Sequence, residues 1–91
     1  MLSVTRYRGE VEGHTVELEF DQRLAVVNRL ELVVDGRTVD RAKVVYGEEE
    51  LSTTLDDGTR VVVVVHSGVV GEATRVQLRR ADGSLIDLQP A

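Results

Sequence analysis

Two histidines and a large set of carboxylates are the residues of this 91-residue chain that could do chemistry. His14 and His66 could bind a metal ion through their ring nitrogens, and the glutamates at 48–50 could add oxygen ligands. Neither histidine stands at the spacing of a ligand pair, so the sequence favours two surface histidines over a metal site. The absence of cysteine excludes thiolate nucleophiles and cysteine-based zinc sites. We therefore predict neither a metal site nor a cofactor.

The sequence supports acid–base or nucleophilic catalysis no better than it supports a metal site. Paired carboxylates act as acid and base when a cleft holds them together with shifted pKa values. The glutamates between positions 10 and 19 lie mainly on a predicted solvent face beside arginines, and the segment 56–58 (Asp-Asp-Gly) is typical of a hairpin turn. The adjacent His66 and Ser67 would point to opposite faces of a strand. We predict no catalytic residue and no enzymatic activity.

Charge and composition limit the partners and the location. The chain has 16 acidic and 11 basic residues and a net charge of −5, which argues against non-specific nucleic-acid binding. Its first residues contain no signal-peptide core, and its longest apolar run, 61–65, is far shorter than the roughly 20 residues of a membrane-spanning helix. The lack of cysteine is compatible with a reducing compartment. We expect a cytoplasmic protein that does not insert into a membrane.

The segment 61–65 organises the predicted fold because it consists of five consecutive valines. Such a run of β-branched residues predicts a strand that is apolar on both faces and lies at the centre of a sheet. A two-residue turn at Asp57-Gly58 would place Leu51 opposite Val64 and so direct Val62 and Val64 into the core.

The same register makes the other valines of the run face outward. An outward apolar stripe must be covered by another segment of the chain or by another molecule. The sequence therefore proposes one candidate interface, formed by Val61, Val63 and Val65.

Acidic-glycine pairs punctuate the chain at regular intervals and predict hairpin turns. They stand at Glu12-Gly13, Asp35-Gly36, Asp57-Gly58 and Asp82-Gly83. A two-residue first turn places Arg8 opposite Glu17 and apolar residues opposite each other. The second hairpin has no consistent two-residue register, which predicts a β-bulge.

The remaining segments are less regular. Residues 21–29 could form a short helix, but we favour a connection that runs into a strand. In the last hairpin a three-residue loop would place Leu78 opposite Leu88 and Arg79 opposite Asp87. Pro90 would then end the pairing, and residues 89–91 would form a tail or the start of a linker.

These patterns together predict one all-β domain over residues 1–91. About eight short antiparallel strands joined by hairpins would form a β-sandwich or a flattened barrel, since the length leaves no room for crossover helices.

The turn and core positions resemble one family over residues 11–88. The resemblance lies in Val11-Glu12-Gly13 with the alternating segment 16–19, in the Asp35-Gly36 hairpin, in Asp57-Gly58-Thr59 before a strand, and in Ser67-Gly68. In these positions the chain resembles a β-sandwich unit of the Fas apoptotic inhibitory molecule family. The resemblance implies the sandwich fold and a non-enzymatic role through protein contacts, since that family is implicated in cell survival and in suppressing aggregation. It transfers no functional residue.

The expected function is that of a protein-interaction module that acts through a sheet face or a sheet edge. Its partner is unknown, and self-association is one form of such a contact. The alternative is a small-molecule-binding accessory domain or the soluble domain of a larger protein, which would need an enclosed apolar pocket with a few polar groups.

Overall fold

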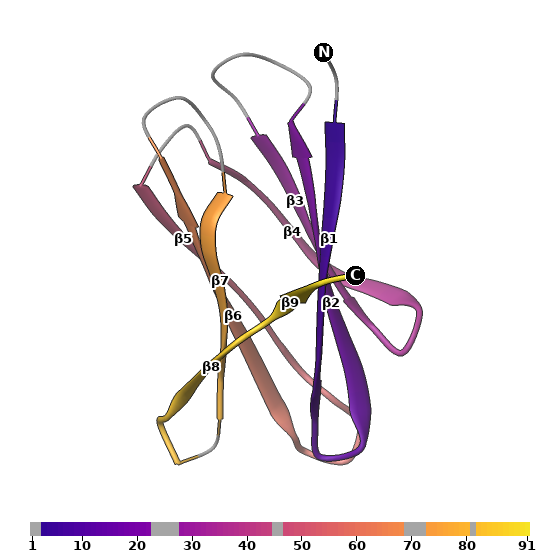
Figure 1. Ribbon diagram of the computed structural model, residues 1–91. Helices are drawn as coiled ribbons and strands as arrows, with labels where there is room; N and C mark the ends of the chain where they lie inside the picture. The colour runs from indigo at the N-terminus through magenta and orange to yellow at the C-terminus, as the bar shows by residue number, and fades with distance from the viewer. Residues whose placement is uncertain (1–2, 23–27, 45–46, 69–72, 81) are drawn as a thin grey trace.

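The computed structural model describes residues 3–22, 28–44, 47–68, 73–80 and 82–91, and these form two antiparallel β-sheets that face each other (Figure 1). Sheet A has the order β4-β3-β2-β1-β9 and sheet B the order β5-β6-β7-β8. The strands of sheet A are β1 (Ser3–Val11), β2 (His14–Gln22), β3 (Asn28–Val34), β4 (Arg37–Val44) and β9 (Gln89–Pro90). Those of sheet B are β5 (Gly47–Thr54), β6 (Arg60–Ser67), β7 (Ala73–Arg79) and β8 (Leu85–Asp87).

The predicted β-sandwich is therefore confirmed, with nine strands among the described residues in place of about eight. The extra strand arises because the C-terminal segment divides between the sheets. Of the ambiguous stretch 21–29, the ends belong to β2 and β3, and residues 23–27 lie outside the described residues. No helix that could span a membrane occurs in the described ranges.

The first hairpin has the predicted register. Glu12 and Gly13 both have positive φ, 49° and 79°, as a two-residue turn that matches strand twist requires. Arg8 lies opposite Glu17, and their side chains are 3.4 Å apart on the outer face. The alternate residues of β2 face sheet B, and Leu18 is fully buried.

The second hairpin contains the predicted bulge. Val33 pairs with Thr38, but Leu32 pairs with Asp40, so Val39 is the extra residue. The shift brings Glu31 opposite Arg41, and Arg41 Nε lies 3.2 Å from Glu31 Oε1. The bulge thus replaces a repulsive carboxylate pair with an attractive ion pair.

The predicted register of β5 and β6 is wrong by one residue. The loop contains three residues, 56–58, because Leu55 N donates to Thr59 O at 2.8 Å and Gly58 N donates to Leu55 O at 2.9 Å. Asp57 Oδ1 accepts a further hydrogen bond from Thr59 N at 2.9 Å. Leu51 therefore lies opposite Val63, and every side chain of β6 faces the sheet side opposite to the predicted one.

This shift corrects the candidate interface. Val61, Val63 and Val65 are 0% exposed and pack in the core between the two sheets. They are not available as a surface, because the three-residue loop turns them inward.

Val62 and Val64 instead occupy the outer face of sheet B, where they are still buried. Arg79 Nη2 on β7 lies 3.4 Å from Glu50 Oε2 on β5. Since β6 lies between these strands, the ion pair extends across its outer face and helps to cover the two valines. The chain's own side chains thus cover the whole valine run.

The last hairpin departs from prediction by two residues. Arg80 N donates to Ser84 O and Gly83 N donates to Arg80 O, so Leu78 pairs with Ile86 and Arg79 with Leu85. The predicted pairs with Leu88 and Asp87 do not form.

Leu88 instead marks the point where the chain crosses from sheet B to sheet A (Figure 1). Its N–H donates to Val76 O in β7, and the next residues pair with β1 as β9. Its side chain is buried against Gly9, where an added Cβ would lie only 2.4 Å from Leu88 Cδ2. Ala91 N donates to Arg6 O, so residues 89–91 extend the sheet beyond the point where Pro90 was predicted to end it.

Candidate functional site

The two lateral sides of the sandwich are both covered by specific contacts. At one side β4 and β5 adjoin as edge strands, and Asp40 Oδ2 accepts a hydrogen bond from Ser52 N at 2.9 Å. The bulge makes this contact available, because it places Asp40 on the same face as the buried Leu32. At the other side the β8–β9 segment crosses between the sheets. An inward carboxylate and a crossing strand are both devices that limit edge pairing.

One end of the sandwich gathers hairpin turns from both sheets around His14. His14 Nδ1 lies 2.6 Å from Asp35 Oδ2 in the β3–β4 turn, and His14 Nε2 lies 2.9 Å from Asp57 Oδ2 in the β5–β6 turn. The other carboxylate oxygens are also used: Asp35 Oδ1 accepts from Thr15 N and Asp57 Oδ1 from Thr59 N, both at 2.9 Å. A single imidazole ring therefore connects sheet A with sheet B.

This arrangement favours the charged form of each group. The hydrogen bonds that the ring of His14 donates to Asp35 and, second in size, to Asp57 raise the pKa of His14 above its ordinary 6.5. The bond from His14, followed by those from Thr59, lowers the pKa of Asp57 to about 2, and the pKa of Asp35 is lowered mainly by its bond with His14. His14 was predicted to be a plain surface histidine, so sequence reasoning missed this cluster.

The second histidine lies elsewhere, in β6. His66 Nε2 is 3.3 Å from Gln77 Oε1, and its Nδ1 is 3.7 Å from Glu48 Oε2. Within the described ranges no group of three His, Asp or Glu side chains is arranged to hold a metal ion. The two histidines that the sequence singled out are thus held by different partners in different parts of the fold.

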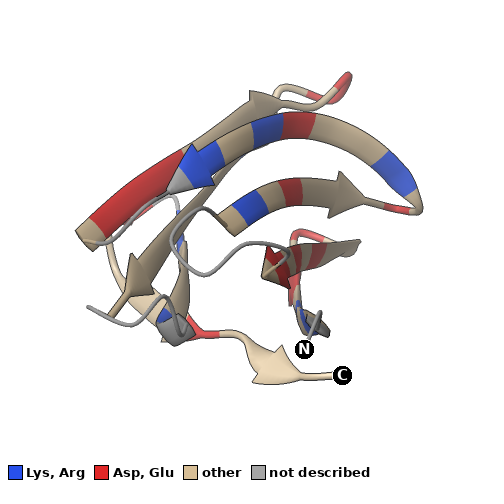
Figure 2. Cartoon of the chain, turned by 90° about the horizontal axis from the view of Figure 1, so that it is seen from above, with Lys and Arg blue, Asp and Glu red and all other residues tan. Residues whose placement is uncertain are grey.

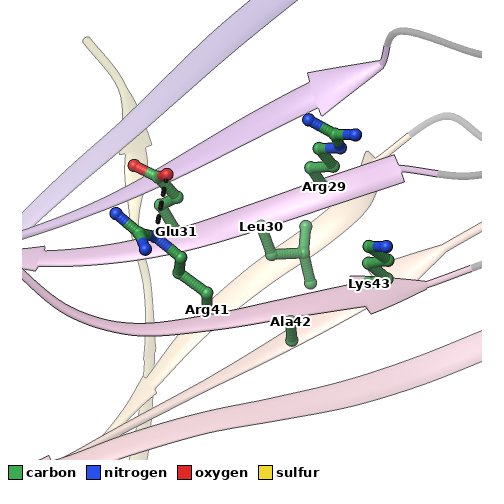
Figure 3. Close-up of a pocket in the computed structure, with 6 residues that line it drawn as sticks. All are labelled: Arg29, Leu30, Glu31, Arg41, Ala42 and Lys43. Carbon is green, nitrogen blue, oxygen red and sulfur yellow. Dashed lines mark hydrogen bonds and ion pairs between the residues drawn. The ribbon is translucent and has the colours of Figure 1, made fainter.

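A groove on the β3–β4 hairpin is lined by more cations than carboxylates. Its volume is about 490 Å³, and it is lined by Arg29, Leu30, Glu31, Arg41, Ala42 and Lys43 (Figure 3). Arg29 and Lys43 are directly opposite cross-strand partners and extend to the same side, while Glu31 and Arg41 are joined by their ion pair. Figure 2 shows the basic positions of β3 and β4 next to each other.

The register explains the electrostatics of this groove. Like charges directly opposite each other on neighbouring strands are destabilising. Among the described residues, neither Arg29 nor Lys43 has an ion-pair partner within 4.0 Å, although Asp21 stands beside Arg29 on β2. Leu30, with 1% exposure, forms part of the core beneath them. The groove therefore presents unneutralised positive charge on a rigid, packed support.

The arrangement defines a class of fold: an all-β sandwich of two antiparallel sheets that carries a basic groove on one hairpin and a histidine cluster at one end. No protein-family model, no curated protein and no solved structure matches this chain. The resemblance to the Fas apoptotic inhibitory molecule family therefore stays a prediction.

Proposed function

We propose that this protein is a non-enzymatic interaction module that binds an acidic segment of a protein partner in the β3–β4 groove. The observation that carries the proposal is the opposed pair Arg29 and Lys43, two cations without an ion pair in the described structure. Arg41 adds a third cation, and its partner Glu31 is the one carboxylate among the described residues of the lining. Carboxylates of a partner would relieve the repulsion between the opposed cations.

A face contact is favoured over an edge contact. The backbone N–H of Ser52 in the edge strand β5 already donates to the Asp40 carboxylate, so it is not free to pair with another strand. The crossing segment after β8 covers the opposite side of the sandwich. The groove, by contrast, lies open to solvent. Because the chain as a whole carries −5, a local positive site would orient an acidic partner and suppress contacts at other surfaces.

The small-molecule alternative is less well supported. An accessory domain of that kind needs an enclosed apolar cavity. The space between the sheets is instead occupied by Val and Leu side chains, including Leu18, Leu32, Leu51 and Leu78 at 0% exposure. The protein is expected to be cytoplasmic, an expectation that rests on the sequence alone.

Charge reversal in the groove tests this function. We expect Arg29→Glu with Lys43→Glu to weaken binding of a fluorescein-labelled peptide of ten glutamates at least tenfold, because two cations that would pair with the peptide carboxylates are replaced by anions. For the unaltered protein, added salt should also weaken binding. Fluorescence anisotropy at low ionic strength measures both effects.

The matched control reverses two cations elsewhere. Arg60→Glu with Arg80→Glu changes the net charge by the same amount at the end of sheet B. If both double variants lose the peptide equally, binding reflects total charge and the groove is not the site. Circular dichroism of each variant confirms that the fold is retained.

A further inference from the structure

The geometry at His14 fixes the protonation state of its ring. An ionised carboxylate only accepts hydrogen bonds, so each ring nitrogen that contacts one must carry a proton. His14 contacts Asp35 through Nδ1 at 2.6 Å and Asp57 through Nε2 at 2.9 Å. Both contacts can be hydrogen bonds at once only when the ring is the imidazolium cation.

We propose that His14 is a pH-responsive clasp: its protonated ring fastens the β5–β6 turn of sheet B to the β3–β4 turn of sheet A, and loss of one ring proton releases the β5–β6 turn. This device is independent of the proposed binding groove, which lies on other residues.

The structure also indicates which bond breaks. A neutral ring keeps one N–H, and the contact with Asp35 is the shorter one and lies within sheet A. Asp35 is further held by Thr15, because its backbone N donates to Thr15 O at 2.9 Å and its Oδ1 accepts from Thr15 N. The proton therefore stays on Nδ1, and the lone pair of Nε2 then faces the Asp57 carboxylate. That contact is repulsive, so the bond between the sheets is the one that is lost.

The released turn keeps its own shape. Asp57 Oδ1 still accepts from Thr59 N, and Leu55 still exchanges its backbone bonds with Gly58 and Thr59. The turn can thus separate from sheet A as a unit.

Other charged groups around the ring bear on its titration. Arg37 of β4 and Asp56 of the β5–β6 turn line the same cleft, whose volume is about 620 Å³, and Glu12 lies in the turn beside His14. Arg37 opposes protonation of the ring, whereas Asp56 and Glu12 favour it. Val34, Val39 and Leu55 form the apolar part of the cleft, which a departing turn would expose further.

The pH window of the clasp follows from the direction of each pKa. The raised pKa of His14 means that its contribution to stability is fully present below 6.5 and is lost as pH rises through the folded-state value. The lowered pKa values of Asp35 and Asp57 mean that their contribution is present above 3.8 and is lost as pH falls, down to about 2 for Asp57. The clasp is therefore closed between these limits and opens on both sides.

The test is a pH titration of the ¹⁵N-labelled protein followed by NMR. We expect the ring nitrogens of His14 to titrate with a midpoint above 6.5. Above that midpoint, nuclear Overhauser contacts between the ring and the β5–β6 turn should disappear, while contacts between the ring and Asp35 should remain.

Two neighbouring substitutions provide the matched comparison. Asp57→Asn should lower the His14 midpoint and remove the pH dependence of the turn, because an amide at position 57 can accept from a protonated Nε2 and donate to a neutral one. Asp56→Asn removes the same charge from a residue that does not hydrogen-bond to the ring. His66→Gln assigns the titration to the correct histidine. The proposal fails if both asparagine variants lower the midpoint equally, or if contacts between ring and turn persist unchanged above the midpoint.

Discussion

Val63→Glu is expected to abolish folding. Val63 is 0% exposed between the sheets and lies opposite Leu51 on one side and Leu78 on the other. A carboxylate at this position would lack any polar partner, and a buried unpaired charge typically destabilises a domain by more than about 4 kcal/mol. That is comparable with the total stability of a small domain, roughly 5–15 kcal/mol. Far-UV circular dichroism and a thermal melt at neutral pH measure the loss.

Val4→Glu is the matched control, because Val4 is 51% exposed at the outer face of sheet A. Its expected cost is less than about 1 kcal/mol, mainly from the neighbouring Asp21 across the strand pair. A folded Val63→Glu protein with an unchanged melting temperature would contradict the three-residue β5–β6 loop. The valine run would then have the register that the sequence suggested.

Leu88→Ala is expected to destabilise the protein by about 2–5 kcal/mol, the usual range for truncation of a buried leucine. Leu88 is 4% exposed and stands where the chain crosses between the sheets, so its side chain fills the side of the sandwich between β1 and β7. Its loss leaves a cavity at that crossing. Urea denaturation measures the change in the free energy of unfolding, and the m-value is expected to stay unchanged.

A double-mutant cycle with Gly9 shows whether the contact itself is responsible. Gly9→Ala alone should destabilise the protein, because the added Cβ would lie 2.4 Å from Leu88 Cδ2. In the Leu88→Ala background that clash is absent, so the same change should cost much less. Additive effects of the two substitutions would mean that Gly9 and Leu88 do not touch.

The sequence predicted the hairpins best where charge and turn chemistry agreed. Arg8 opposite Glu17 fixed the first register, and the conflict between Glu31 and Asp40 indicated the bulge that the structure contains. Both hairpins turn through a pair with positive φ at the acidic residue and at the glycine. In these cases local pattern and turn geometry point to one answer.

The predicted register of β5 and β6 is wrong because a run of identical valines has no alternation of apolar and polar residues. Either face of β6 could enter the core, so only the loop length decides the register. The signal that was missed is the hydroxyl residue after the glycine: Thr59 N and Ser84 N each donate to an aspartate two residues earlier. This bond accompanies the longer loop in both hairpins, whereas the two-residue turns have His14 or Arg37 at that position.

The histidine cluster and the basic groove depend on longer-range placement. His14 is separated from Asp57 by 43 residues, and only the stacking of two sheets brings them together. The opposed pair in the groove depends on the bulge, which sets the register of Arg29 and Lys43. Neither feature is visible until the pairing of strands is known.

The meandering order of the strands has a consequence for the folding kinetics. Every strand pair except β1–β9 joins consecutive strands, so most of the sheet ladder closes only short loops. Such local topology favours fast folding for an all-β chain. The β1–β9 pair must instead close nearly the whole chain, and we expect it to form late. In native-state hydrogen exchange, Ala91 N–H, which bonds to Arg6 O, should then exchange sooner than the amides of β2 and β6.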